Sequence, residues 1–134
     1  MSSAPLIALL QQRLPALMAI YAFGSRIVNQ GQAARADSDL DLAVLLEGYA
    51  DPLVLFDLSG DLADLAACPV DLIDLRAAST VMQYQILTTG EAWWRKDVRA
   101  GLFEAAMLSE KMSLDQARAG VLRDVSLSGR VYGR

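Results

Sequence analysis

Three short apolar runs constrain the fold of this chain more than any other feature. They cover Leu17–Phe23, Leu40–Leu46 and Val70–Leu75, and turn-forming or polar residues bound each one. Runs of this length are typical of buried β-strands, because helices need longer periodic segments. More than twenty residues separate the second run from the third. That length permits a parallel crossover connection containing a helix.

Helical patterns fill most of the chain between and around these runs. Asp51 and Pro52 form a suitable N-cap and first helical residue, and apolar residues then recur at three- and four-residue spacing, at Leu55, Leu58, Leu62 and Leu65. The sequence predicts further helices over Ser3–Leu14 and Ala77–Thr89 and a short edge strand over Ala92–Trp94. Residues 97–134 are predicted to form a helical C-terminal segment. A possible capping box at Ser113 and Gln116 leaves open whether it holds one helix or two.

These elements predict an α/β (α+β) fold, in which flanking helices cover a small mixed β-sheet. The chain of 134 residues is 54% hydrophobic, which is suited to one packed domain spanning residues 1–134. It has one cysteine, so no internal disulfide can form. Because the N-terminus lacks the basic start of a signal peptide and no apolar stretch reaches about 18 residues, we expect a cytoplasmic protein without a membrane span.

The absence of histidine excludes several classes of enzyme. The chain has no histidine and a single cysteine, so a Ser-His-Asp triad, a Cys-His pair and a His-ligated zinc site are all impossible. A bound metal would have to be a hard, oxygen-ligated cation such as magnesium, manganese or calcium. Proton transfer would fall mainly to carboxylates.

Charge is unevenly distributed along the chain. Residues 1–94 carry four arginines against eleven acidic residues, whereas residues 95–134 carry eight basic residues against five acidic ones. The acidic front is unsuited to direct contact with nucleic acid. The basic C-terminal segment fits either an acidic partner or an ordinary solvated helix.

Carboxylates gather where the second and third predicted strands begin. Asp39 and Asp41 are two residues apart, so strand geometry places both side chains on one face, with Cα atoms roughly 6.5 Å apart. The pair can bind one cation or two, or it can be a solvated acidic strand end. If the two strands are parallel, Asp71 lies beside this pair, whereas Asp74 points to the opposite face.

A Gly-Ser turn follows the first predicted strand directly. Gly24 allows a sharp turn or a close approach of the backbone to a ligand. Ser25 can offer a hydroxyl and an N–H to a phosphate oxygen. Arg26 can reach a phosphate, or it can form a surface salt bridge.

The combination of these motifs resembles the nucleotidyltransferase superfamily related to DNA polymerase β. It most closely resembles the minimal nucleotidyltransferase (MNT) group, the MntA-type antitoxins. The matching segments are Ala22-Phe23-Gly24-Ser25-Arg26, Ser38-Asp39-Leu40-Asp41-Leu42-Ala43-Val44 and Val70-Asp71-Leu72-Ile73-Asp74-Leu75. One difference is the spacer of thirteen residues between Ser25 and Asp39, which is longer than is usual in the group.

The resemblance implies an activity, a site and a partner. Asp39, Asp41 and Asp71 would hold two Mg²⁺ ions, with Mn²⁺ as a substitute, and Asp71 would act as general base. Gly24 and Ser25 would hold the triphosphate of ATP, and Arg26 would assist. The implied reaction transfers AMP from ATP to a tyrosine of a HEPN-domain ribonuclease toxin, with which the chain would form a hetero-oligomer.

Two alternatives to this antitoxin enzyme remain at the level of sequence. The chain can neutralise a toxin by binding alone, with its site unused. It can also be a nucleotidyltransferase that modifies a small molecule, although 134 residues leave little room for the substrate domain such enzymes usually carry. The HEPN signature itself contains a histidine, so this chain is not the toxin.

Overall fold

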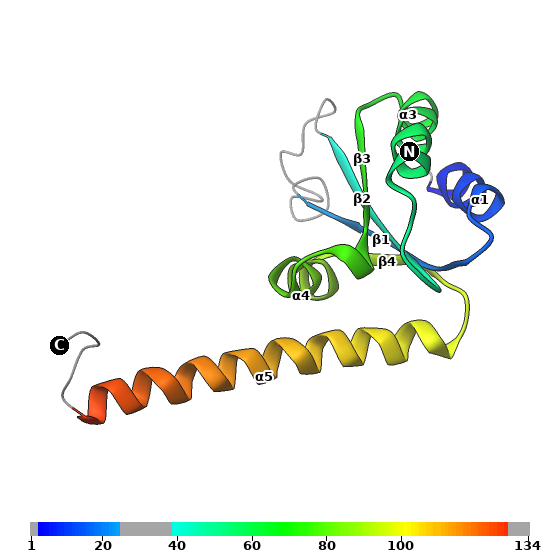
Figure 1. Ribbon diagram of the computed structural model, residues 1–134. Coiled ribbons are helices and arrows are strands. Elements are labelled where there is room, and N and C mark those ends of the chain that lie inside the picture. The colour runs from blue at the N-terminus through cyan, green and yellow to red at the C-terminus, as the bar shows by residue number, and fades with distance from the viewer. Residues whose placement is uncertain (1–2, 25–38, 129–134) are drawn as a thin grey trace.

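One mixed four-stranded sheet forms the centre of the protein. The computed structural model describes residues 3–24 and 39–128, and the strands lie in the order β3-β2-β1-β4 (Figure 1). β1 pairs antiparallel with β2 and with β4, while β2 and β3 are parallel, as the long connection between them permits. The strands are β1 (Leu17–Phe23), β2 (Leu40–Leu46), β3 (Val70–Asp74) and β4 (Glu91–Arg95).

Helices cover both faces of this sheet (Figure 1). They are α1 (Ala4–Arg13), α3 (Pro52–Ala66), α4 (Thr80–Thr89) and α5 (Val98–Ser128), with a 3₁₀ turn η1 (Leu75–Ala77) after β3. α1 and α3 pack on one face, and α4 and the first part of α5 pack on the other, so the core has two layers. This architecture confirms the fold class predicted from the sequence.

The side chains of β2 alternate between the two core layers. Leu40, Leu42 and Val44 pack under α1 and α3, whereas Ala43 and Leu45 belong to the layer under α4 and α5. The side chain of Asp41 lies on the same face of β2 as those of Ala43 and Leu45, because residues two apart along a strand share a face. The acidic start of β2 therefore belongs to the α4–α5 side of the sheet, opposite the leucines, as the sequence predicted.

Local caps set the element boundaries. Asp51 caps α3 by accepting a hydrogen bond from the backbone N–H of Leu53 at 2.9 Å, as predicted. α4 begins at Thr80, three residues later than predicted, because Ser79 caps it by accepting from the N–H of Met82 at 3.1 Å. β3 ends at Asp74, since its carboxylate accepts from the N–H of Arg76 and starts the 3₁₀ turn.

α5 is one helix of 31 residues that passes through Ser113 and Gln116 without a break. At ~1.5 Å per residue it is about 46 Å long, and its later part extends beyond the rest of the fold (Figure 1). The predicted C-terminal segment is thus helical to Ser128, and residues 129–134 lie outside the described part. In the ranges described, no helix has an apolar stretch long enough to span a membrane.

A buried tyrosine anchors α5 to the sheet. The hydroxyl of Tyr21 on β1 donates to Glu104 Oε2 at 2.6 Å, and Arg95 of β4 binds the same carboxylate at 2.7 and 3.2 Å. Burial, and then the adjacent Glu104 carboxylate, hold the pKa of Tyr21 above its ordinary value. The hydroxyl therefore stays protonated and donates to Glu104.

Candidate active site

Two of the predicted site carboxylates start neighbouring parallel strands. Asp41 of β2 and Asp71 of β3 are register partners, so their backbones lie about 4.8 Å apart across the sheet. Asp39 lies two residues before Asp41 and is exposed at the same end of the strand. The structure therefore places Asp41 and Asp71 side by side, with Asp39 two residues before Asp41 at the same end of the sheet.

The charges of these aspartates act on one another. Burial raises the pKa of Asp41 above its ordinary value, and the negative charges of Asp71 and then Asp39 raise it further. The negative charges of Asp39 and Asp71 beside Asp41 form a region of negative potential, which a divalent cation would relieve. Within the described residues, however, no three acidic, histidine or cysteine side chains are gathered closely enough to hold a metal ion.

The backbone at the end of β1 lies directly against the Asp41 carboxylate. Gly24 has a φ of +88°, which side-chain-bearing residues rarely adopt. A Cβ placed on Gly24 would also collide with the carboxylate of Asp41. Both the conformation and the close approach therefore require glycine. Ser25 and Arg26, the other predicted phosphate-binding residues, lie outside the described residues.

A second glycine supports the same end of β1, and sequence reasoning did not include it in the site. A Cβ on Gly90 would lie 2.6 Å from the carbonyl oxygens of both Ala22 and Ile86. The backbones of α4 and β1 thus meet at Gly90, just before the Gly24 turn. The sequence signalled Gly90 only as the end of a helix. Its φ is −88°, so the requirement is steric rather than conformational.

Asp74 has a structural role on the opposite face. Its carboxylate accepts hydrogen bonds from the backbone N–H groups of Ala50 at 2.9 Å and Arg76 at 3.0 Å. It lies in register with Val44, three residues along the strand from the Asp41–Asp71 pair. Asp74 is therefore held by backbone groups away from the Asp41–Asp71 pair.

Comparison with known protein families decides the class of this site. The family model described as polymerase beta nucleotidyltransferase matches residues 5–99, which include both glycines and all four of these aspartates. The chain is a nucleotidyltransferase of this family. The match confirms the resemblance that the Gly-Ser turn and the paired aspartates indicated.

Individual relatives refine the comparison. This nucleotidyltransferase is 37% identical over 120 residues to the protein adenylyltransferase MntA of Shewanella oneidensis, covering 90% of this chain and 84% of that protein. It is also similar to a chain of a toxin–antitoxin crystal structure with AMP-PNP, with a TM-score of 0.78 and 35% identity over 94% of this chain and 99% of that one.

A third similar chain comes from a structure that contains an AMPylated toxin. It belongs to a structure of the tri-AMPylated Shewanella oneidensis HEPN toxin in complex with an MNT antitoxin. The TM-score is 0.72 and the identity 32%, over 92% of this chain and 95% of that chain.

Proposed function

We propose that this nucleotidyltransferase is a cytoplasmic antitoxin that transfers AMP from ATP to a tyrosine of a cognate HEPN ribonuclease toxin and thereby silences it. The relatives support this assignment, because they include a protein adenylyltransferase, a complex with an ATP analogue and a complex with an AMPylated HEPN toxin. The stable product is a hetero-oligomer of antitoxin and toxin.

The observation that carries the proposal is the Asp41–Asp71 pair with the Gly24 backbone packed against it. The chemistry of the donor set suits Mg²⁺ or Mn²⁺, since Asp39 and Asp41 at the start of β2 and Asp71 on the neighbouring β3 offer hard oxygen ligands. Asp39, Asp41 and Asp71 would hold the ions. When bound, these ions would neutralise triphosphate charge and stabilise the leaving pyrophosphate.

The residues of the chain have separate roles in the proposed reaction. The Gly24–Ser25 turn holds the triphosphate, and Arg26 contacts a phosphate oxygen. The tyrosine hydroxyl oxygen bonds to the α-phosphorus, and the bond from that phosphorus to the pyrophosphate oxygen breaks. Asp71 accepts the hydroxyl proton. Chemistry of this kind depends mainly on positioning and charge, so a site without histidine can perform it.

Mass spectrometry of the toxin tests this proposal. Toxin incubated with the chain, ATP and Mg²⁺ is expected to gain the mass of adenylyl groups on tyrosine. The Asp39→Asn/Asp41→Asn double variant should lose this transfer, whereas Asp64→Asn, which alters an exposed carboxylate on α3, should retain it.

The same variants distinguish transfer from neutralisation by binding. If the double variant still protects cells from the toxin fully, the chain acts by covering its partner. Loss of protection in the double variant, with protection by Asp64→Asn intact, supports transfer as the mechanism.

A further inference from the structure

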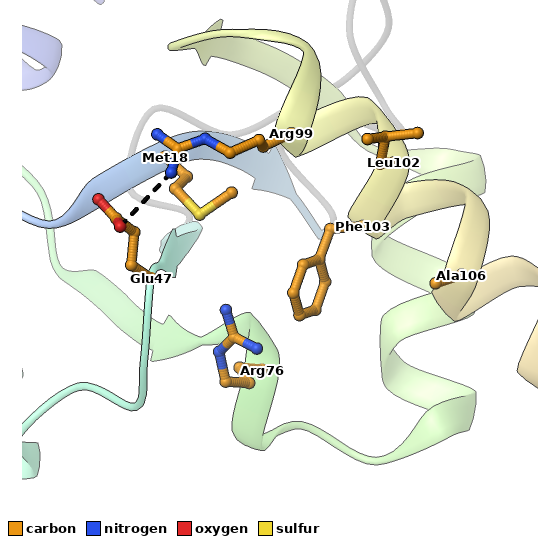
Figure 2. A pocket seen from close by; sticks show the side chains of 7 residues that line it. All are labelled: Met18, Glu47, Arg76, Arg99, Leu102, Phe103 and Ala106. Atoms are coloured by element: carbon orange, nitrogen blue, oxygen red, sulfur yellow. Dashed lines mark hydrogen bonds and ion pairs between the residues drawn. The ribbon is translucent and has the colours of Figure 1, made fainter.

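An open groove lies at the end of the sheet opposite the aspartates. It has a volume of about 440 Å³ and lies between α5, the start of β1 and the segments after β2 and β3 (Figure 2). We refer to it as the α5 groove, lined by Met18, Glu47, Arg76, Arg99, Leu102 and Phe103. Met18 and Phe103 belong to the α4–α5 core layer, so the groove opens on the same side of the sheet as Asp41.

The two arginines of the groove differ in how their charges are balanced. Arg99 forms ion pairs with Asp97 at 3.0 Å and Glu47 at 3.4 Å. Arg76 instead donates to the carbonyl oxygens of Leu46 at 2.6 Å and Gly48 at 3.2 Å. In the portion of the chain described, Arg76 has no carboxylate within ion-pair distance.

Aromatic contacts hold the Arg76 guanidinium at the groove wall. It lies 4.1 Å from the ring centroid of Phe103 and 5.9 Å from that of Tyr49. The carbonyls occupy Nε and Nη2, and no described residue accepts from Nη1. Arg76 thus presents a held guanidinium, which has no ion pair within the described residues, to a carboxylate entering from outside.

The rim of the groove is apolar and exposed. Val98 and Leu102 are one helical turn apart on α5 and are 73% and 65% exposed, and Tyr49 is 73% exposed. Exposed apolar side chains around a single unpaired arginine are typical of protein-binding sites, in which arginine and aromatic residues act as anchors.

We propose that the α5 groove docks the toxin. An acidic side chain of the toxin would pair with Arg76, and apolar toxin side chains beside it would pack on Val98 and Leu102. This inference rests on the proposed function, which supplies the partner. The six residue steps from Asp41 to Glu47 span only about 20 Å of strand. A folded partner of ~100 residues has a radius of gyration of about 13 Å, so it can occupy the groove and still reach the aspartates.

Substitutions of opposite charge at one groove position test the sign of the charge on the toxin surface that docks there. Leu102→Asp and Leu102→Lys remove the same apolar contact, but only the aspartate would repel an acidic side chain. Affinity for the cognate HEPN toxin is measured by calorimetry without ATP, so that binding is separated from transfer. We expect Leu102→Asp to weaken binding at least tenfold more than Leu102→Lys does.

A matched control and an independent readout keep this test specific. Leu53 on α3 is 74% exposed and lies outside the groove, so Leu53→Asp should bind the toxin like the parent chain. ATP binding by both Leu102 variants should also equal that of the parent, which shows that the catalytic end is folded.

Several results would overturn the docking proposal. Parental affinity in both Leu102 variants would exclude the groove, and a greater loss with lysine than with aspartate would exclude an acidic partner surface. Self-association of the parent chain that both variants abolish would assign the groove to a second copy of this chain. If these results occur while the parent still adenylylates the toxin, the docking proposal fails and the proposed function stands.

Discussion

The two ends of the central sheet differ in how much room they leave. At the aspartate end, Gly24 and Gly90 are both positions where a single added carbon would collide with neighbouring atoms. At the opposite end, the α5 groove is open, with Leu102 exposed and the Arg76 charge unpaired among the described residues. The same strands therefore connect an end where the backbones at Gly24 and Gly90 are closely packed, here called the packed end, to the open α5 groove.

This difference corresponds to two physical tasks. Phosphoryl transfer depends on holding reacting atoms within a fraction of an ångström, which favours a rigid backbone without spare volume. Docking of a protein requires accessible apolar and charged anchors. The ends also differ in charge, since the packed end carries the three site aspartates and the open end presents Arg76. If the aspartates carry out transfer and the α5 groove docks the toxin, as proposed, a change at one end should leave the function of the other intact.

Metal removal is the strongest way to separate the two ends. Excess EDTA should abolish AMP transfer, because the three carboxylates would hold the cations that neutralise the triphosphate. Toxin affinity should be unchanged, since the α5 groove uses no metal. Transfer assays and calorimetry on the same sample measure both quantities, and Mg²⁺ added beyond the chelator should restore transfer. Undiminished transfer in excess EDTA would contradict the metal assignment.

Substitutions of Asp71 and Asp74 should have opposite consequences. Asp71→Asn should lower transfer at least about a hundredfold, the scale of general acid–base catalysis, with little effect on stability. Asp74→Asn should retain most transfer but lose roughly 1–3 kcal/mol of stability, because one of the two backbone N–H groups that Asp74 binds loses its acceptor. Transfer rates and thermal midpoints of both variants check this pattern. Equal losses of transfer would show that Asp71 has no special place in the site.

The local parts of the fold and the pair of strands at the site could be predicted from the sequence. The bounds of β1 and β2 agree with the predicted strands because apolar runs end there at Gly24 or at charged residues. Strand periodicity placed Asp39 and Asp41 together, and the long connection to β3 allowed Asp71 to join them.

Features that depend on tertiary packing could not be predicted in this way. Gly90 looks like any helix-ending glycine until β1 is placed against α4. Arg76 has no distinguishing motif, and only the approach of α5 places Phe103 over its guanidinium. The Ser113–Gln116 capping pattern also occurs inside an uninterrupted helix, because such side chains cap a terminus only where the backbone ends.

Adding one methyl group at Gly90 should affect the packed end specifically. Gly90→Ala forces the backbone of α4 or β1 to move, and overpacking of this kind costs ~1–3 kcal/mol. We expect transfer to fall roughly tenfold, with a higher KM for ATP, since the Gly24 turn follows Ala22 closely. Gly60→Ala is the matched control, because Gly60 lies in α3 with open space around it and should gain slightly in stability. A loss of stability with an unchanged KM would reduce Gly90 to a purely structural residue.

Tyr21 lies in β1 between the two ends of the sheet. We therefore expect Tyr21→Phe to retain both AMP transfer and toxin binding. The variant loses the hydroxyl that donates to Glu104, but Arg95 still pairs with that carboxylate. The expected cost is therefore near 1 kcal/mol, which lowers the thermal midpoint by about 4 °C for a domain of this size. Tyr84→Phe is the control, since Tyr84 is 40% exposed and its ring contact with Lys111 survives the change. Differential scanning calorimetry measures both variants.

A transfer rate or toxin affinity that falls more than about threefold in Tyr21→Phe would show that the two ends are coupled through β1 and α5, and the independence argued above would be wrong.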